Sequence, residues 1–206
     1  MTGLFITLEG GDGAGKSTQA ELLAGWLEQR GYEVVRTREP GGTPLGLELR
    51  QLLLHGDAVD PHAEALLYAA DRAQHVAEVV RPALDRGAVV VQDRYIDSSL
   101  AYQGAARSLD LTEVRWLSEW ATDGLWPQLT VLLDVDPGLA VGRRIAAGGR
   151  ADRLESEAVE FHRAVRKGFL AFAEAEPQRY LVLDATQAID ALHHAIVARL
   201  RPLLTD

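Results

Sequence analysis

The stretch "LEGGDGAGKST", residues 8–18, decides the fold of this chain. Within it, Gly10–Ser17 matches the pattern G-x-x-x-x-G-K-[ST], between the apolar run "LFITL" (4–8) and a helix-like stretch. Glycines at these positions let backbone N–H groups turn inward around an anion, and the N-terminus of the following helix adds partial positive charge. The stretch therefore predicts a phosphate-binding loop, or P-loop, that holds a nucleoside triphosphate.

Two side chains of the P-loop carry further chemistry. Lys16 is expected to reach the β- and γ-phosphates as a point charge, and the Ser17 hydroxyl is expected to bind Mg²⁺. The predicted residues that bind the nucleoside triphosphate are Gly10, Gly11, Asp12, Gly13, Ala14, Gly15, Lys16, Ser17 and Thr18.

Apolar runs rich in Val, Ile and Leu alternate with helical stretches along the chain. Such runs are typical of buried strands in a parallel sheet covered on both faces. We expect strands at 4–9, 33–38, 88–93, 129–135 and 180–185. We expect helices at 16–30, about 45–55, about 61–86, about 111–122, 137–147, 156–176 and 187–204. The pattern predicts one α/β domain over 1–206, a three-layer P-loop fold with a parallel sheet. Glycine, small residues and charge coincide at "AAGGRADR" (146–153), which predicts a mobile flap.

Composition excludes several classes of function. The chain has 206 residues, a net charge of −9 and no cysteine. The negative charge argues against a general nucleic-acid binder, and the lack of cysteine excludes disulfides, thiolate catalysis and Cys-ligated zinc. No apolar run is long enough to cross a membrane and no export signal is visible, so we expect a cytoplasmic enzyme or binding protein without a membrane partner.

The P-loop alone does not choose a function, but two P-loop classes can be set aside. The chain contains no asparagine, so it cannot carry the Asn-Lys-x-Asp guanine reader of GTPases, and the Leu-Ser-Gly-Gly-Gln signature of transporter ATPases is missing. An enzyme that passes phosphate to a second small substrate remains. "VVVQDRY" places Asp93 and Arg94 at the end of a strand, where Asp93 could organise Mg²⁺ through water and Arg94 could bind a phosphate. The following "SSLAYQG" (98–104) is interpreted as a base-reading loop.

Five sequence blocks together resemble the bacterial thymidylate kinases. They are "EGGDGAGKSTQ", "TREPGGTPLG", "LLYAADRAQH", "DRYIDSSLAYQG" and "ATDGLWPQLTVLLDV", and the resemblance runs from residue 4 to about residue 185. It implies a five-stranded parallel sheet with a lid, conversion of ATP and dTMP to ADP and dTDP, a requirement for Mg²⁺, and a homodimer.

The resemblance also assigns roles at the acceptor site. It implies that Tyr68 stacks on thymine and that Arg72 bonds the base; the two are four residues apart on a predicted helix and so share one face. An arginine only donates, which suits the O4 acceptor of thymine and mismatches the amino group of cytosine. Gln103 resembles the family's base-contacting amide, Ser99 its polar neighbour, and Tyr102 the ring that crowds the 2′ position.

Charged residues complete this predicted site. Arg50 and Arg94 resemble the clamps on the monophosphate, while Glu39 and Asp12 resemble the acidic residues near the acceptor sugar, phosphate and metal. The predicted acceptor-binding residues are Glu39, Arg50, Tyr68, Arg72, Arg94, Ser99, Tyr102 and Gln103. The predicted metal site is Ser17 with Asp93, the latter through water.

Gly13 decides which arginines are candidates for catalysis. Relatives with glycine rather than arginine at this P-loop position resemble the type whose catalytic arginines come from the lid, here about 146–155. "DRLE" (152–155) matches the lid pattern best, which favours Arg153 over Arg150, whereas Arg143 and Arg144 are interpreted as a solvated helix face. The predicted catalytic residues are Asp12, Lys16, Arg94, Arg150 and Arg153.

Two other functions and one structural question stay open at this point. The chain could be a kinase for dUMP, UMP or CMP, or a P-loop regulatory protein without acceptor chemistry. Trp116, Trp120 and Trp126 lie close together and could belong either to the core or to an interface.

Overall fold

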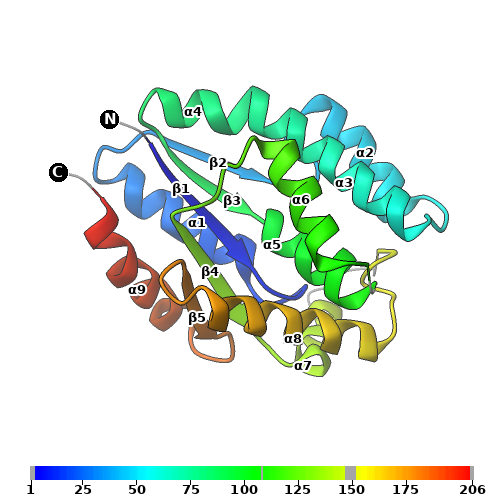
Figure 1. Ribbon diagram of the computed structural model, residues 1–206. Helices are drawn as coiled ribbons and strands as arrows, with labels where there is room; N and C mark the ends of the chain where they lie inside the picture. Colours follow the sequence, from blue (N-terminus) through cyan, green and yellow to red (C-terminus); the bar gives the residue numbers. More distant parts are fainter. Residues whose placement is uncertain (1–2, 108, 147–151, 205–206) are drawn as a thin grey trace.

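The computed structural model describes residues 3–107, 109–146 and 152–204, and these residues form one five-stranded parallel sheet flanked by helices (Figure 1). The strands are β1 (Leu4–Glu9), β2 (Val34–Arg38), β3 (Val89–Asp93), β4 (Leu129–Asp134) and β5 (Tyr180–Asp184). Their order is β2-β3-β1-β4-β5, and every neighbouring pair is parallel. The α/β fold with a five-stranded parallel sheet is therefore confirmed.

Helices cover both faces of the sheet. They are α1 (Lys16–Glu28), α2 (Pro44–His55), α3 (Pro61–His75), α4 (Arg81–Asp85), α5 (Ile96–Ser99), α6 (Leu111–Thr122), α7 (Pro137–Ala146), α8 (Val159–Ala175) and α9 (Ile189–Leu200). Three tighter or wider turns join or extend them: the π-helical η1 (Val76–Val80) and η2 (Leu100–Ala106), and the 3₁₀ turn η3 (Arg201–Leu203). No helix among the described residues is long and apolar enough to cross a membrane.

The central strand β1 shows why the sheet is buried on both sides. Ile6 and Leu8 pack in one cluster with Leu23 of α1 and Ile196 of α9. Phe5 points the other way and belongs to a second cluster that includes residues of η1 and α4. Because successive side chains in a strand alternate between faces, both faces of β1 are covered and neither is exposed to solvent. Because all five strands are parallel, their carboxyl ends lie at the same edge of the sheet. The P-loop follows β1 at this edge, and Asp93 ends β3 there.

The largest differences between the expected elements and the structure are at four places. The stretch 98–104, expected as a loop, is helical, because it lies within α5 and η2. The helix expected over 61–86 contains η1, where Arg81 donates its N–H five residues back to Val76 just before Pro82, which has no N–H to donate. The other two differences are the start of α8 at Val159 and the end of α9 at Leu200.

The late start of α8 leaves the end of the lid as a turn. Asp152 and Glu155 bond reciprocally, each backbone N–H donating to the other's carboxylate at 2.9 Å. This exchange closes a local turn that is separate from the helix. The rest of the lid, 147–151, lies outside the described residues, and so does the predicted catalytic residue Arg150.

Candidate active site

Three glycines give the P-loop its shape. Gly10, Gly13 and Gly15 have φ angles of +129°, +79° and +96°, which side-chain-bearing residues rarely adopt. A Cβ on Gly10 would lie 2.3 Å from the carbonyl oxygen of Leu133, and one on Gly13 would lie 2.7 Å from that of Ala140. The backbone therefore has no room for an arginine at position 13 in this conformation.

Lys16 starts α1 and folds back over the loop. Its Nζ donates to the carbonyl oxygens of Gly10 (3.1 Å) and Gly11 (2.9 Å). Burial lowers its pKa, as does the nearby Arg94 guanidinium. The ammonium is thus fixed at the loop, where it can contact the oxygens of a bound triphosphate.

Ser17 and Asp93 offer oxygen atoms for a metal ion. Ser17 Oγ donates to Asp93 Oδ2 at 2.9 Å. Within the described part of the chain, no cluster of three His, Cys, Asp or Glu side chains could hold a metal by itself. Mg²⁺ is usually bound by one or two protein oxygens together with substrate phosphates and water. This hydroxyl–carboxylate pair fits such an ion when a nucleotide is present.

One cleft of about 560 Å³ brings the two predicted halves of the site together. All the predicted acceptor-binding residues line it: Glu39, Arg50, Tyr68, Arg72, Arg94, Ser99, Tyr102 and Gln103. From the P-loop and metal site, the cleft is lined by Asp12, Gly13, Gly15, Lys16, Ser17, Thr18 and Asp93. The P-loop and the predicted acceptor-binding residues therefore face one common space.

Arg72 is the most fully bonded side chain in the cleft. Its Nε donates to Glu39 Oε2 (2.8 Å), and its Nη2 donates to the Tyr95 carbonyl and to Ser99 Oγ, both at 3.1 Å. Nη1 donates to Ser118 Oγ at 3.4 Å. These contacts among the described residues use four of the five guanidinium N–H groups. The remaining N–H, on Nη1, is left for a ligand atom at a fixed position.

Glu39 is in turn held by a histidine to which the sequence assigned no role. His75 Nδ1 donates to Glu39 Oε1 at 2.9 Å, and Thr37 Oγ1 lies 2.6 Å from His75 Nε2. Asp71 lies nearby, and its pKa is raised to about 6 by burial and by the Glu39 carboxylate. His75 stands three residues after Arg72 in "DRAQH", and its place on the same helix face was the available signal.

Arg94 has an unusual backbone conformation for its residue type. Its φ of +68° is left-handed, which costs free energy for a residue other than glycine and is often found at functional sites. Its guanidinium pairs with Asp12, donates to Ser98 Oγ at 3.1 Å and lies 5.1 Å from the centre of the Tyr102 ring. Burial raises the pKa of Asp12, but Arg94 and Lys16 more than offset this effect and hold it below its usual range. Asp12 is therefore a carboxylate that orients Arg94.

Glu9 is a second residue to which the sequence assigned no role, and it bonds Ser98, the serine that Arg94 contacts. It is fully buried at the end of β1 and accepts hydrogen bonds from the Tyr95 N–H (2.7 Å) and Ser98 Oγ (2.6 Å). Burial, and secondarily the Asp97 carboxylate, raise the pKa of Glu9 to about 8. The signal for it was a charged residue at the end of a buried strand, directly before the P-loop.

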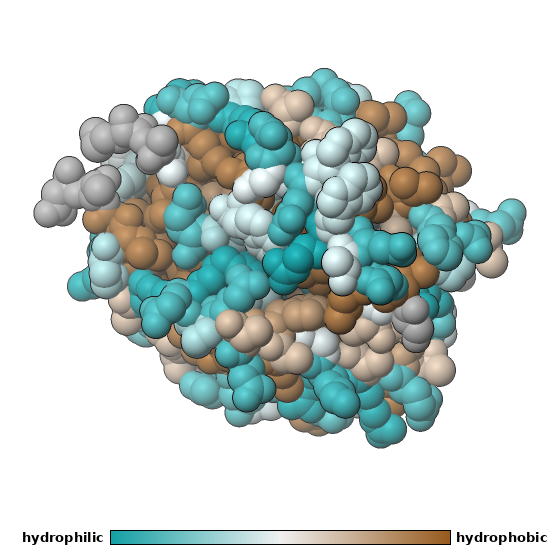
Figure 2. Space-filling model, in the orientation of Figure 1, coloured by the Kyte–Doolittle hydropathy of each residue, from teal (hydrophilic) through white to brown (hydrophobic). Residues whose placement is uncertain are grey.

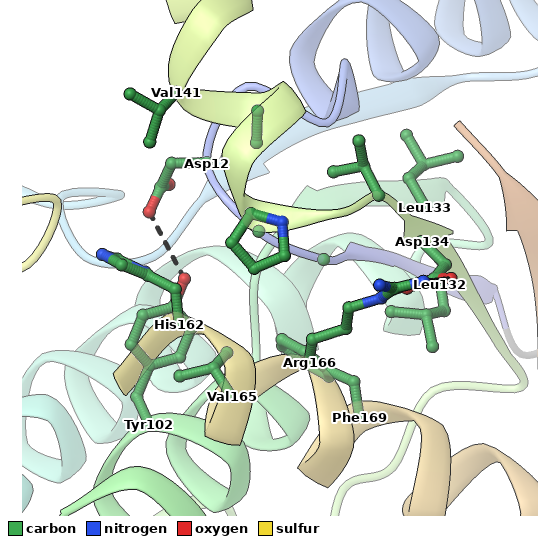
Figure 3. Close-up of a pocket in the computed structure, with 15 residues that line it drawn as sticks. Asp12, Tyr102, Leu132, Leu133, Asp134, Val141, His162, Val165, Arg166 and Phe169 are labelled. Carbon is green, nitrogen blue, oxygen red and sulfur yellow. Dashed lines mark hydrogen bonds and ion pairs between the residues drawn. The ribbon is translucent and has the colours of Figure 1, made fainter. Parts of the chain in front are cut away.

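Tyr102 separates the cleft from a second, smaller cavity behind the P-loop. Figure 3 shows Tyr102 pointing toward Asp12, to whose Oδ2 its hydroxyl donates at 3.3 Å. The cavity behind it is about 40 Å³, and its lining includes Gly10, Gly11 and His162. A space of this size holds one or a few water molecules. Of these two spaces among the described residues, the cleft is the one large enough for a nucleotide.

The structure does not bring Arg153 to the P-loop. Its guanidinium pairs with the buried Glu64, and its Nε donates to the carbonyl oxygen of Leu53 at 2.7 Å. Its backbone N–H donates to the carbonyl oxygen of Leu54 at 3.0 Å. It is not among the residues that line the cleft. Of the other lid-side arginines, Arg150 and the side chains of 143–144 lie outside the described residues. The catalytic role of the lid arginines therefore stays a prediction.

The comparison with known proteins is decisive on the family. Residues 8–196 match the sequence profile of thymidylate kinase. The chain belongs to the thymidylate kinase family. It is 62% identical to the thymidylate kinase of Clavibacter michiganensis over 205 residues, covering 99% of this chain and 97% of that protein. It is 50% identical to that of Halothermothrix orenii, covering 99% of both.

A solved structure gives the same result for the fold. The thymidylate kinase of Ehrlichia chaffeensis superposes with a TM-score of 0.80 at 33% identity, covering 97% of this chain and 99% of that one. Thymidylate kinases are nucleoside-monophosphate kinases, so this chain belongs to an enzyme family. The alternative of a P-loop regulatory protein without acceptor chemistry is thereby set aside.

Proposed function

We propose that this protein transfers the γ-phosphoryl group of ATP to dTMP, giving ADP and dTDP for dTTP synthesis. The observation that carries the proposal is the single cleft in which the P-loop faces a base-reading arginine, Arg72, on α3. Family membership supports dTMP over UMP and CMP as the acceptor.

Transfer in such a site depends on alignment and charge neutralisation. The attacking oxygen belongs to a phosphate that is already ionised, so no general base is needed. Lys16 is placed to contact the donor phosphates, and Arg94 and Arg50 to hold the acceptor phosphate; Arg50 Nη1 is held by the Pro40 carbonyl at 2.9 Å. We propose that Mg²⁺ binds at Ser17 and Asp93 and neutralises charge on the donor phosphates.

Recognition of the acceptor nucleoside follows from two fixed groups. The free N–H of Arg72 suits the O4 acceptor of thymine and mismatches the amino group of cytosine. The Tyr102 ring, held through its hydroxyl by Asp12, is expected to crowd the 2′ position and so to favour deoxyribose. Tyr68 lines the same cleft one helical turn before Arg72 and is placed to stack on the base.

A lid arginine is expected to complete charge neutralisation. Arg153 was favoured by its sequence pattern, but moving it to the phosphates would leave Glu64 buried with one guanidinium fewer. These contacts favour Arg150 as the arginine that reaches the transferred group, with Arg153 anchoring the lid.

We further propose a cytoplasmic homodimer. Trp116 and Trp120 are 64% and 72% exposed on α6 and stack on each other with ring centroids 6.3 Å apart. Two large exposed aromatic side chains on one helix are typical of an interface. Apolar residues also reach the surface at the upper right of Figure 2, where Figure 1 places α2 and α3, and α6 packs against α3. The cytoplasm is the compartment that supplies the ATP.

The experiment that tests the activity is a coupled assay of ADP release over a panel of nucleoside monophosphates. We expect dTMP to be the best acceptor and activity to disappear when EDTA removes Mg²⁺. The proposal fails if dTMP releases no more ADP than a blank without an acceptor.

A further inference from the structure

Glu64 is a fully buried carboxylate that joins three parts of the acceptor site. It lies in α3, one helical turn before Tyr68. Its Oε1 accepts a hydrogen bond from Gln103 Nε2 at 2.9 Å, and its Oε2 pairs with Arg153. Arg107 contacts both oxygens, at 3.4 and 3.5 Å. Neither the sequence pattern nor the proposed chemistry gives Glu64 a role.

The contact with Gln103 has a consequence for the cleft. A side-chain amide has a donating end and an accepting end, and a carboxylate facing two guanidinium groups can only accept. Gln103 must therefore turn its Nε2 toward Glu64. Its Oε1 is then the amide atom left for the cleft, which Gln103 lines.

We propose that Glu64 sets the hydrogen-bonding polarity of the base site by fixing the Gln103 amide with its oxygen toward the base. This inference rests on the proposed function and names a positioning residue for it. Thymine carries a hydrogen on N3 and needs an acceptor opposite it, whereas N3 of cytosine has a lone pair and needs a donor. Reversing the amide to suit cytosine would set Gln103 Oε1 against the Glu64 carboxylate, with no hydrogen between them.

Two arginines place positive charge beside the buried Glu64 carboxylate. A lone carboxylate in this buried position would be strongly disfavoured, and Arg153 and Arg107 supply the opposite charge. Arg107 also pairs with Glu157, at 2.6 Å, and is itself partly exposed. Arg107 can therefore be removed while Glu64 keeps one guanidinium partner and its bond to Gln103.

The test compares Glu64→Gln with a matched control, Arg107→Gln. Glutamine at 64 can donate or accept, so it frees the Gln103 amide to turn; the control weakens the ion pair but leaves an acceptor at 64. The probe is the deoxyribonucleoside monophosphate of pyrimidin-2-one, whose N3 is an acceptor and whose C4 carries no group for Arg72 to read. The measured quantity is kcat/KM for dTMP divided by kcat/KM for this analogue.

We expect this ratio to fall by about tenfold or more in Glu64→Gln and to stay at the wild-type value in Arg107→Gln. The double variant Glu64→Gln/Gln103→Glu should restore the ratio, because a carboxylate at 103 again presents only acceptors to the base. An unchanged ratio in a folded, ATP-binding Glu64→Gln protein overturns the inference, and so does an equal fall in the Arg107→Gln control.

A measurement on the wild type does not depend on any variant folding. Neutron diffraction distinguishes nitrogen from oxygen, so crystals of the protein, with or without dTMP, reveal which end of the Gln103 amide faces Glu64. Nitrogen toward Glu64 is expected, and oxygen toward Glu64 overturns the inference. If the wild type instead releases no ADP with dTMP, the proposed function fails, and the orientation of Gln103 is still read from the crystals.

Discussion

Ser17 and Asp93 are 76 residues apart in the chain, yet the Ser17 hydroxyl donates a 2.9 Å hydrogen bond to the Asp93 carboxylate. The contact exists because β1 and β3 are neighbours in the sheet, so that the P-loop after β1 and the residue ending β3 meet at one edge. It joins the P-loop to the segment that carries Arg94.

Replacing Asp93 by asparagine should therefore impair the use of the metal. An amide keeps a hydrogen-bonding partner for Ser17 but removes a negative charge from the site of a divalent ion. We expect kcat to fall by about tenfold or more and the Mg²⁺ concentration for half-maximal rate to rise, measured by titrating Mg²⁺ at constant ATP. Asp123→Asn, on the exposed carboxylate after α6, is the control. Equal Mg²⁺ dependence in both variants would place the ion elsewhere.

Replacing Arg72 should separate base recognition from nucleotide-donor binding. In Arg72→Ala, catalytic efficiency with dTMP should fall by about 100-fold or more while ATP affinity is kept, because Arg72 contacts the acceptor half of the cleft alone. The free energy of unfolding should also drop, by about 3–5 kcal/mol, since Glu39 loses a buried partner. Arg72→Lys keeps the charge but not the planar fork and should recover stability more than activity. Parallel loss of ATP and dTMP binding would remove the base-reading role.

The lid arginines should differ in the kind of damage that their loss causes. Arg150→Ala should lower kcat by about 10³-fold with little change in KM for dTMP, as for other arginines that neutralise a transferred phosphoryl group. Arg153→Ala should lower the melting temperature and reduce kcat less than Arg150→Ala does. The reason is that Arg153 pairs with Glu64 and donates to two carbonyl oxygens of α2. Steady-state kinetics and thermal unfolding of both variants decide the matter. The reverse pattern would return the catalytic role to Arg153.

The strands and the P-loop were predictable because their signals are local. Short runs of Val, Ile and Leu specify buried strands, and glycines at Gly10, Gly13 and Gly15 specify a backbone that only they adopt readily. The four-residue spacing of Tyr68 and Arg72 placed both in the cleft because a helix repeats every 3.6 residues.

The features that the sequence did not reveal depend on contacts between distant residues. The stretch 98–104 reads as a loop because of its serines, glutamine and glycine, yet Ser99 and Gln103 are buried against α3, where Arg72 and Glu64 bond them. Tertiary hydrogen bonds of this kind override local preference. In the same way, no pattern around Arg153 reveals that its partner lies 89 residues earlier, at Glu64.

Exposed tryptophans on α6 lead to a prediction about assembly. If Trp116 and Trp120 belong to a dimer interface, the wild type should sediment at twice the chain mass of 22.4 kDa. The double variant with serine at both positions should shift toward the monomer at micromolar concentration, because large aromatic anchors dominate interface energy. Leu139→Ser, which removes an exposed apolar side chain from α7, should leave the mass unchanged. A monomeric wild type would end the dimer proposal.

Glu9 leads to a prediction about pH and stability. Its pKa in the folded protein, about 8, is above the ordinary 4.5, so the fold favours its protonated form. Stabilisation from that form is complete below about pH 4.5 and is lost as the pH rises toward 8. The free energy of unfolding of the wild type should therefore decrease over this window, by up to about 1.4 kcal/mol per pH unit. Asp71, with a pKa of about 6, also makes the protein less stable as the pH rises, but its titration is complete at a lower pH than that of Glu9.

Denaturant unfolding of Glu9→Gln between pH 6.5 and 8.5 tests this prediction where Asp71 contributes least. Glutamine can still accept from the Tyr95 N–H and donate to Ser98 Oγ, but it does not ionise. The free energy of unfolding of Glu9→Gln should fall less with increasing pH than that of the wild type. The difference between the two proteins should therefore shift in favour of Glu9→Gln as the pH rises from 6.5 to 8.5. Curves that stay parallel across the range would mean that Glu9 does not titrate there, and that the carboxylate is ionised beneath Arg94 at neutral pH.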